Sequence, residues 1–441
     1  RFPFHSASLL DAALARSAAW FSVWRRTPVA QRAQALVVLA RTLRDNAATM
    51  ANMISVEMGK PVTQARGEIE KCAQLCEWYA EHGPAMLTAE PTLVEGGKAR
   101  IEYRPLGPIL AVMPWNFPIW QVLRGAVPAL IAGNTYVLKH APNVMGSAYL
   151  LRDALQRANF PEGVFEVINV TPDGVSTAIA DPRIAAVTLT GSVRAGMAIG
   201  AQAGAAMKKC VLELGGSDPF IVLNDADLDE AVKAAVIGRY QNTGQVCAAA
   251  KRLIVEQGIV EEFTRKFVEA TRQLVVGDPL AADTYIGPMA RFDLRDELDQ
   301  QVRDTLEEGA TLLLGGKKAE GPGNYYEPTV FADVTDQMTS FKQELFGPVA
   351  SIITARDAAH ALALANDSEF GLASTIYTRN VELAQQMAGE LETGGVFING
   401  YCASDPRVTF GGVKKSGFGR ELSHFGVREF CNAQTVWLDR R

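Results

Sequence analysis

The feature that most constrains the fold is a regular alternation of short apolar segments and helical segments between residues 106 and 214. The apolar segments cover residues 108–113, 134–139, 164–169, 185–190 and 209–214, and the segments between them have helical spacing. A chain that alternates strand and helix in this way forms right-handed βαβ units around a parallel sheet. We therefore predict an α/β fold, with helices on both faces of that sheet.

Polar residues stand where these predicted strands end. Asn116 follows the first strand, Lys139 ends the second, Ser192 follows the fourth, and Glu213 lies at the end of the fifth. The carboxyl ends of parallel strands meet at one edge of a sheet, and α/β proteins bind their ligands at that edge. The sequence therefore predicts a functional site there.

The remaining segments extend this pattern. Residues 7–58 and 62–81 have the spacing of helices, and residues 252–399 contain a second alternation of strands and helices. Residues 87–104 contain short strands on either side of Gly96 and Gly97, which is the pattern of a β-hairpin. A final short strand is predicted at residues 435–438. Because an isolated hairpin is only marginally stable in water, we expect this one to dock on another subunit.

Composition excludes several classes of function. The 441 residues carry a net charge of −6, so no nucleic-acid partner is expected. The apolar runs are too short to span a membrane and no signal peptide is recognisable, so we expect no membrane contact and a cytoplasmic location. Six cysteines are too few for a disulfide scaffold and suit a reducing compartment. Cys72 and Cys76 lack the further ligands of a zinc site, so we expect no metal and interpret both as packing residues.

The residues 241–251 present one cysteine, Cys247, after a turn of small residues that includes Gly244. Upstream of this turn, Glu213 precedes Gly215 and Gly216. A thiol and a carboxylate beside flexible backbone are the groups that covalent chemistry on a carbonyl carbon requires. The alternative for Cys247 is a buried packing cysteine, and the alternative for Glu213 is a surface acid at a strand end.

A dinucleotide site has only a partial signal. The Gly-x-Gly-x-x-Gly fingerprint is absent after the first strand. In its place, Gly191 and Ser192 form a turn that opens a helix, and the N–H groups of a helix N-terminus bind phosphate. The alternative for Ser192 is an ordinary helix cap. Lys139 suits a contact with ribose hydroxyls or phosphate, and its alternative is a surface lysine.

Seven motifs, spread in order over nearly the whole chain, are shared with one known family. They are Pro114-Trp-Asn-Phe-Pro118, Gly133-Asn-Thr-Tyr-Val-Leu-Lys139, Thr190-Gly-Ser192, Leu212-Glu-Leu-Gly-Gly216, Gly244-Gln-Val-Cys247, Glu344-Leu-Phe-Gly-Pro348 and Phe410-Gly-Gly-Val-Lys-Lys-Ser-Gly417. This set resembles the NAD(P)-dependent aldehyde dehydrogenase superfamily. Within it, residues 138–144 and 399–404 look most like those of the bacterial NAD(P)-dependent succinate-semialdehyde dehydrogenases.

The resemblance implies the aldehyde dehydrogenase fold, an α/β fold in three parts. An NAD(P)-binding domain with a Rossmann-like sheet is expected over residues 1–86 and 106–215. An α/β catalytic domain is expected over residues 216–420. A β-hairpin oligomerisation arm over residues 87–105 and a tail over residues 421–441 complete the chain. Members of the family form dimers or tetramers, so the resemblance implies a homodimer or homotetramer.

The resemblance also implies the catalytic roles. Cys247 is expected to attack the aldehyde carbon, with the Asn116 amide and the Cys247 backbone N–H stabilising the oxyanion. Loss of hydride to the nicotinamide leaves a thioester on Cys247, and Glu213 is expected to activate the water that hydrolyses it. Without the resemblance, Asn116 would be interpreted as a turn residue before Pro118.

The same resemblance implies NAD or NADP as cofactor. Glu344 is expected to bind the nicotinamide ribose, with a capping acid as its alternative role. Pro142 stands where many NAD-preferring members carry a glutamate that would repel a 2′-phosphate, so the preference between NAD and NADP stays open. The expected cofactor contacts are Trp115, Lys139, His140, Ala141, Pro142, Gly191, Ser192, Leu214, Glu344 and Phe346.

Arg124 is the main indication of the substrate. It matches the arginine that binds the distal carboxylate in succinate-semialdehyde enzymes, and a guanidinium suits such a group. The alternative is an internal salt bridge. Better-known members have another arginine six residues before the cysteine, where this chain has Gln241, so a second contact is expected from Ser404 or Arg407. Ala249 stands where some relatives carry a second cysteine, so no regulatory disulfide is expected.

These observations favour NAD(P)-dependent oxidation of succinate semialdehyde, a small-molecule aldehyde, to succinate. The alternative within the enzyme class is another small aldehyde, whether carboxylated, amino or aliphatic. A CoA-acylating dehydrogenase is disfavoured because that branch lacks the glutamate that Glu213 represents. A non-catalytic relative is expected to have lost Cys247 or Glu213. A cysteine hydrolase requires a histidine partner, and no motif supplies one.

Overall fold

The computed structural model describes residues 2–95 and 97–439, and its first sheet confirms the predicted parallel arrangement. The parallel strands, in spatial order, are β7 (Lys209–Glu213), β6 (Ala186–Thr190), β3 (Pro108–Met113), β4 (Thr135–His140) and β5 (Phe165–Ile168). Helices cover both faces, so the strands are buried along almost their whole length and have continuous apolar sequences. Asn116, Ser192 and Glu213 therefore lie at the same edge of the sheet.

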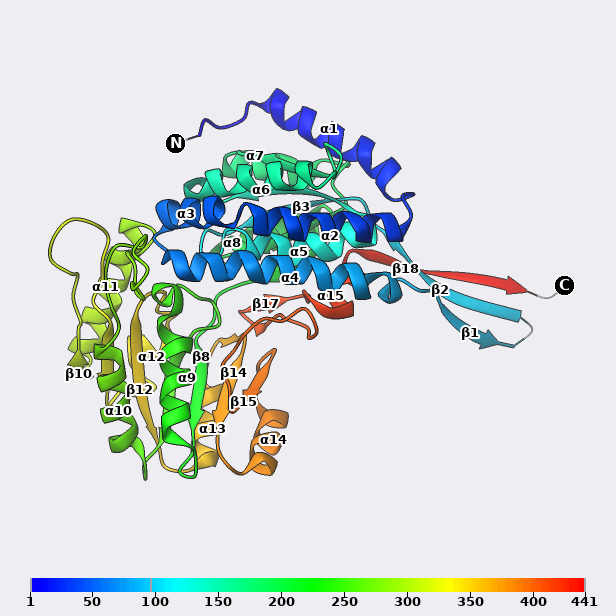
Figure 1. The fold of residues 1–441 in the computed structure, drawn as a ribbon. Coiled ribbons are helices and arrows are strands. Elements are labelled where there is room, and N and C mark those ends of the chain that lie inside the picture. The colour runs from blue at the N-terminus through cyan, green and yellow to red at the C-terminus, as the bar shows by residue number, and fades with distance from the viewer. Residues whose placement is uncertain (1, 96, 440–441) are drawn as a thin grey trace.

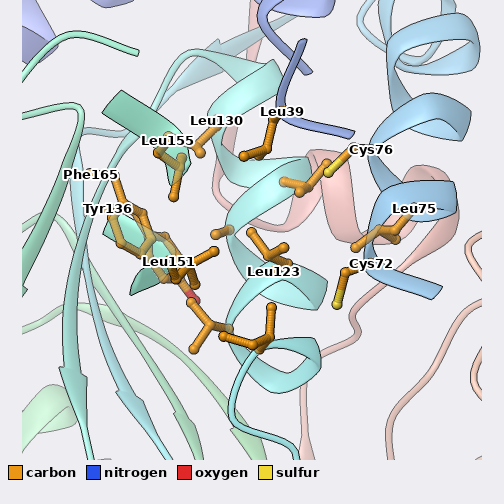
Figure 2. Packing of buried hydrophobic residues seen from close by; sticks show 14 of the residues in the cluster. Leu39, Cys72, Leu75, Cys76, Leu123, Leu130, Tyr136, Leu151, Leu155 and Phe165 are labelled. Carbon is orange, nitrogen blue, oxygen red and sulfur yellow. The ribbon is translucent and has the colours of Figure 1, made fainter. Parts of the chain in front are cut away.

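Helix α5 (Trp120–Ala132) is the most enclosed helix of this region, with all 13 of its residues buried. Figure 2 shows side chains of the sheet and of α6 (Met145–Arg157) on one side of α5, and side chains of α2 (Val29–Asp45) and α4 (Val62–Met86) on the other. Cys72 and Cys76 belong to the α4 side and are fully buried, which confirms that they are packing residues. The other helices around this sheet are α1 (Ala7–Trp24), α3 (Ala47–Met58), α7 (Pro172–Ala180) and α8 (Val193–Ala205).

The second sheet has seven strands in the described part of the chain. In spatial order they are β10 (Thr311–Leu314), β11 (Thr329–Ala332), β12 (Val349–Ala355), β9 (Ala250–Glu256), β8 (Asp218–Val222), β14 (Ser374–Tyr377) and β15 (Val396–Ile398). All neighbours are parallel except β10 and β11. The flanking helices are α9 (Leu228–Tyr240), α10 (Val260–Arg272), α11 (Phe292–Glu307), α12 (Thr339–Lys342), α13 (Ala358–Asn366) and α14 (Val381–Glu390).

The sequence analysis did not predict β8, although it lies near the middle of the second sheet. This strand has only five residues and follows directly on Gly215 and Gly216, so its apolar run is short and has no clear start. Helix α9 was also not predicted. The second alternation therefore begins before Cys247 rather than after it, and Cys247 lies between α9 and β9.

A three-stranded arm extends away from both sheets (Figure 1). Strands β1 (Glu90–Val94) and β2 (Gly97–Pro105) are antiparallel, which confirms the predicted hairpin, whereas Gly96 at its turn lies outside the described residues. The C-terminal strand β18 (Cys431–Asp439) pairs with β2 along its whole length and is longer than predicted. Helix α15 (Ser423–Glu429), just before β18, packs on α5 and α4.

Two short pairings connect the last part of the chain to the sheets. Strand β17 (Gly417–Phe418) pairs antiparallel with β7, with Gly417 opposite Glu213. Strand β13 (Phe370–Gly371) pairs with β16 (Val413–Lys414). A Cβ at Gly417 would lie 1.9 Å from the carbonyl oxygen of Leu212, so only glycine allows the chain to approach Glu213 this closely.

Two further observations concern the described residues as a set. Among residues 2–95 and 97–439, no helix is long and apolar enough to cross a membrane. Over the same residues, no group of three or more His, Cys, Asp or Glu side chains is arranged to hold a metal ion.

Candidate active site

Cys247 follows a turn with an uncommon backbone. Asn242, Thr243 and Gly244 have φ angles of 54°, 58° and 70°, so three consecutive residues are left-handed. This conformation is strained for a β-branched threonine, and such strain persists where the surroundings enforce it. A Cβ at Gly244 would lie 2.3 Å from the carbonyl oxygen of Gly347, so the turn is pressed against the loop that carries Glu344.

Side chains from other elements fix this turn. The Asn242 N–H donates to Oε1 of Gln64 on α4 (2.8 Å), and the Thr243 hydroxyl donates to the carbonyl oxygen of Gly287 (3.1 Å). The Asn242 side-chain amide donates to the carbonyl oxygen of Asn116 (2.8 Å). The turn before Cys247 and the loop after β3 are thus held together directly.

Two cavities meet at the Cys247 side chain. The first, about 250 Å³, lies at the carboxyl edge of the first sheet and is bounded on its other side by α11. The second, about 740 Å³, lies between α4, α5 and the loop before Phe410. Among the lining residues, Cys247 and Gln121 are common to both cavities. Cys247, which is half-buried, therefore lies at the boundary of both cavities.

The first cavity brings together most of the residues predicted for catalysis and for the cofactor. Those that line it are Trp115, Asn116, Gly191, Ser192, Glu213, Leu214, Cys247, Glu344 and Phe346. They come from the loops after β3, β6 and β7, from the cysteine turn and from the loop before β12. The second cavity contains both predicted substrate residues, Arg124 and Ser404.

Lys139, His140, Ala141 and Pro142 do not line the first cavity as the structure defines it. The His140 side chain is fully buried, with Nε2 2.8 Å from the carbonyl oxygen of Pro118, and burial lowers the pKa of this imidazole to about 4. This side chain holds the loop after β3, so only the backbone of His140 is available to a ligand. Burial also lowers the pKa of Lys139, which lies at the end of β4.

Glu213 is a buried carboxylate without protein partners. Neither of its oxygens has a hydrogen-bond partner among the described residues. Burial raises the pKa of this carboxyl well above its usual range, and the negative charge of Glu421 adds to the rise while Arg124 opposes it. The group is therefore a stronger base than an exposed glutamate once it is ionised.

The Cys247 thiol is also desolvated. Burial raises its pKa to about 11, against the opposing effect of the positive charges of Arg124 and Lys251. The Lys251 ammonium donates to the carbonyl oxygens of Cys247 (2.6 Å) and Val246 (3.0 Å). Lys251 thus fixes the backbone of Cys247 and supplies a positive charge beside it.

Glu344 is linked to the same lysine. Its Oε1 accepts from Nζ of Lys251 and from the N–H of Gly216, both at 3.1 Å. A Cβ at Gly215 would lie 2.1 Å from Oε2 of Glu344, so glycine is required where this carboxylate meets the strand end. Arg239 on α9 donates from Nε to the carbonyl oxygen of Val349 (2.6 Å) and holds the loop that carries Glu344.

Asn116 has a donor available for an oxyanion. Its Nδ2 donates to the carbonyl oxygen of Gln245 (3.1 Å), and its Oδ1 has no partner among the described residues. An amide nitrogen carries two hydrogens, so one of them is not used by this bond. Asn116 and Cys247 line the same cavity.

Arg124 forms an internal salt bridge and also lines a cavity. Its Nε forms a buried ion pair with Glu421, so the internal salt bridge exists. Its Nη2, however, has no hydrogen-bond partner among the described residues, and the side chain lines the second cavity. The guanidinium also lies 4.6 Å from the centre of the Phe410 ring. Arg407, in contrast, pairs with Asp405 at 2.8 Å and is largely exposed.

Several residues around the cavities were not predicted. Gln121 lines both cavities, Lys71 lines the second, and Lys251 and Glu421 contact predicted residues. One signal was present in the sequence, because Lys71 belongs to a polar stripe at helical spacing on α4. This stripe consists of Gln64, Gly67, Lys71, Gln74 and Trp78, and all of these residues line the second cavity. The contribution of α11 to the first cavity had no comparable signal.

Known proteins share this arrangement over the whole chain. A sequence model of the aldehyde dehydrogenase family matches residues 1–436. The chain belongs to this family. The succinate semialdehyde dehydrogenase [NAD(P)+] Sad of Escherichia coli K12 is 66% identical over 438 residues, which are 99% of this chain and 95% of that protein. The succinate-semialdehyde dehydrogenase [NADP(+)] of Mycobacterium avium is 49% identical over 433 residues, 97% of this chain and 92% of that protein.

Solved structures of aldehyde dehydrogenases have the same fold. The succinic semialdehyde dehydrogenase of Streptococcus pyogenes, solved with NADP+ as cofactor, has a TM-score of 0.98 at 35% identity and covers 100% of this chain and 97% of its own. The structure of Gox0499, described for its selection of cofactor and substrate, has a TM-score of 0.97 at 41% identity, covering 99% and 96%. The α/β aldehyde dehydrogenase fold expected from the motifs is confirmed.

Proposed function

We propose that this aldehyde dehydrogenase oxidises succinate semialdehyde to succinate with NAD+ or NADP+. The observation that carries the proposal is the junction at Cys247 between two cavities, one with Glu213 and Glu344 and the other with Arg124. The 66% identity to the NAD(P)+ succinate semialdehyde dehydrogenase of Escherichia coli supports the same substrate. The reaction converts aldehyde, water and NAD(P)+ into carboxylic acid, NAD(P)H and a proton.

The first step is attack of the Cys247 thiolate on the aldehyde carbon. The new carbon–sulfur bond gives a hemithioacetal whose oxyanion accepts from the free hydrogen of the Asn116 amide and from the Cys247 N–H. Removal of one such donor typically slows a reaction by about 10²–10³. Arg124 and Lys251 favour the thiolate form, because both lower the pKa of Cys247 against the larger effect of burial.

The first cavity fits a nicotinamide cofactor. Its wall carries the aromatic rings of Trp115 and Phe346, the Glu344 carboxylate and the buried Thr190 hydroxyl, which has no partner among the described residues. NAD(P)+, when bound, supplies the hydride acceptor. We assign the nicotinamide half to Glu344 and Phe346. The other predicted contacts are Trp115, Lys139, His140, Ala141, Pro142, Gly191, Ser192 and Leu214.

Glu213 acts on the thioester that remains on Cys247 after hydride loss. Its carboxylate accepts a proton from water, the water oxygen attacks the acyl carbon, and the carbon–sulfur bond breaks to release the acid. Its raised pKa suits this role, because a desolvated carboxylate is a stronger base than an exposed one once it is ionised. Arg124 and Ser404 bind the distal carboxylate of the substrate in the second cavity.

We also infer the organisation of the whole protein. Residues 1–86 and 106–215 form the NAD(P)-binding domain and residues 216–420 the catalytic domain. Residues 87–105 and 421–441 form an oligomerisation arm and tail that join a homodimer or homotetramer. The sparse cysteines, all of them free in this structure, suit a cytoplasmic enzyme.

The proposal is tested by comparing kcat/KM for succinate semialdehyde with that for butanal, which has the same chain length but no carboxylate. The unmodified enzyme should prefer succinate semialdehyde by at least about 100-fold, the order of about 3 kcal/mol that hydrogen bonds to a charged group contribute. Arg124→Leu should lower this preference at least tenfold. Arg124→Lys, which keeps a cation beside Glu421, is the control for folding and should retain part of it.

A different small aldehyde is the second candidate, and the ion pair between Arg124 and Glu421 is the observation that favours it. If that pair is the whole function of Arg124, Arg124→Leu leaves the ratio of the two kcat/KM values unchanged. The same measurement therefore decides between the two candidates.

A further inference from the structure

Lys71 is the one cation of the second cavity that has no carboxylate partner among the described residues. It projects from α4, and its ammonium donates to the Ser404 hydroxyl (3.0 Å) and lies 4.0 Å from the centre of the Trp120 ring. The second cavity, with Cys247 in its wall, is lined by both Lys71 and Ser404. The ammonium is therefore held by neutral groups only.

The other charges that line this cavity are already paired. Arg124 pairs with Glu421, and Arg407 pairs with Asp405. The two remaining carboxylates of the lining also have partners: Glu68 pairs with Lys60, and Glu70 pairs with Arg44. Lys71 thus gives the cavity one positive charge that the described protein residues do not neutralise.

The Lys71 ammonium is largely removed from solvent. Burial is the main reason that the pKa of the Lys71 ammonium is lowered to about 8; the positive charge of Arg124 contributes to the lowering, and the negative charge of Asp405 opposes it. A desolvated ammonium that only neutral groups contact is unfavourable without an anion beside it. A small anionic ligand in the second cavity would supply that anion.

We propose that Lys71 is a specificity-determining residue, whose ammonium binds the distal carboxylate of the aldehyde together with the Ser404 hydroxyl and Arg124. This assignment rests on the proposed function and deepens it. Gln241 stands where better-known succinate-semialdehyde enzymes carry an arginine. With Lys71 in this role, the second cation comes from α4 instead of from the turn before Cys247.

The hydrogen bonds available to the two groups fit this role. The Lys71 ammonium has three hydrogens, and one of them is used by Ser404. Because the Ser404 oxygen accepts from Lys71, its own hydrogen remains free to donate to a carboxylate. The Trp120 ring restricts the ammonium to a fixed position through a cation–π contact. Ser404 was expected from the sequence as a substrate contact, and Lys71 is the group that orients it.

The test measures steady-state kinetics of Lys71→Met on succinate semialdehyde and on butanal. Loss of a charged contact to the distal carboxylate should raise KM for succinate semialdehyde at least tenfold with a much smaller change in kcat. The ratio of kcat/KM for the two aldehydes should then fall at least tenfold. Lys71→Arg should recover part of the ratio. Lys233→Met, on the exposed surface of α9, is the matched control and should leave both substrates unchanged.

A second readout needs no turnover. Succinate should protect Cys247 of the unmodified enzyme from alkylation by iodoacetamide, whereas butyrate should protect it less, and Lys71→Met should weaken protection by succinate at least tenfold. If Lys71→Met leaves the ratio of kcat/KM for the two aldehydes unchanged, the assignment of Lys71 is overturned. The proposed function still stands in that case, provided that the unmodified enzyme prefers succinate semialdehyde. An unmodified enzyme without that preference would overturn the proposed function itself, and the assignment with it.

Discussion

At the scale of single residues, loss of solvent disfavours the charged forms of the two groups that we propose to react. Glu213 is buried and Cys247 is half-buried, and loss of solvent raises the pKa of the thiol to about 11 and the pKa of the carboxyl well above its usual range. Lys251 and Arg124 reduce the cost of ionising the thiol, so the charge of the nucleophile depends on cations that are themselves held by Glu344 and Glu421.

This state predicts how Cys247 reacts with pH. Below its raised pKa the thiolate fraction grows about tenfold per pH unit, so alkylation of Cys247 by iodoacetamide in the absence of cofactor should accelerate about tenfold per unit from pH 7 to 10. Lys251→Met removes a cation that lowers this pKa and should slow the reaction at each pH. Peptide mass spectrometry identifies the alkylated cysteine.

Cys247→Ala should abolish the labelled peptide, and Lys233→Met serves as the control for removal of a lysine elsewhere. A rate that levels off near pH 8 would show that the thiol is not desolvated as the structure places it.

Of the polar residues predicted at strand ends, Asn116, Ser192 and Glu213 line one cavity with Cys247, whereas Lys139 does not. Lys71 and Glu421 could not be predicted in the same way. Lys71 lies on a long helix. The spacing of apolar residues shows which face of a helix is buried, but it does not show whether a polar face borders solvent or a cavity. Glu421 becomes a partner of Arg124 only through the tertiary fold.

At the scale of elements, the start of α5 is held by one buried carboxylate. Oε1 of Glu68 accepts from the N–H groups of Ile119 (2.9 Å) and Trp120 (3.0 Å), which satisfies two of the free donors of that helix. Oε2 of Glu68 forms an ion pair with Lys60. This helix carries Gln121 and Arg124, so Glu68 fixes one wall of each cavity.

Removal of Lys60 should therefore destabilise the protein strongly. In Lys60→Met the Glu68 carboxylate remains buried without its cation, and such changes typically cost about 3–5 kcal/mol of folding free energy. The effect should appear as a lower midpoint of chemical denaturation. The Lys233 ammonium is exposed, so Lys233→Met should change the free energy of unfolding, calculated from the same denaturation curves, by less than about 0.5 kcal/mol. A Lys60→Met protein as stable as its parent would show that Glu68 is protonated or solvated instead of paired.

The parallel strands of the first sheet were predictable because they are buried on both faces and have continuous apolar sequences. Strand β8 was not, since five residues after two glycines give too short a signal. Strand β18 is nine residues long because it pairs with β2 along its length, and a pairing partner far away in the sequence cannot be inferred from periodicity.

At the scale of the whole molecule, the arm presents apolar side chains to solvent. Leu93, Trp437 and Leu438 are 91%, 54% and 68% exposed on a sheet of three strands. We expect a second copy of the chain to cover them. The double variant Leu93→Lys, Leu438→Lys should shift the sedimentation coefficient from that of an oligomer to that of a monomer.

Val56→Lys is the matched control, because Val56 on α3 is 72% exposed and lies outside the arm. It should leave the assembly intact. A parent protein that sediments as a monomer, or an arm variant that sediments as the parent does, would contradict a role of the arm in assembly.

The position of Cys247 between two cavities has a consequence for the order in which molecules leave. In the function that we propose, the dinucleotide occupies the first cavity and the aldehyde the second, so neither has to pass through the space of the other. The reduced cofactor can depart while the acyl group is still attached to the enzyme, and its departure clears the side on which Glu213 and an incoming water molecule lie. Release of the reduced cofactor and hydrolysis of the thioester then take place one after the other in the first cavity. The acid leaves through the second cavity.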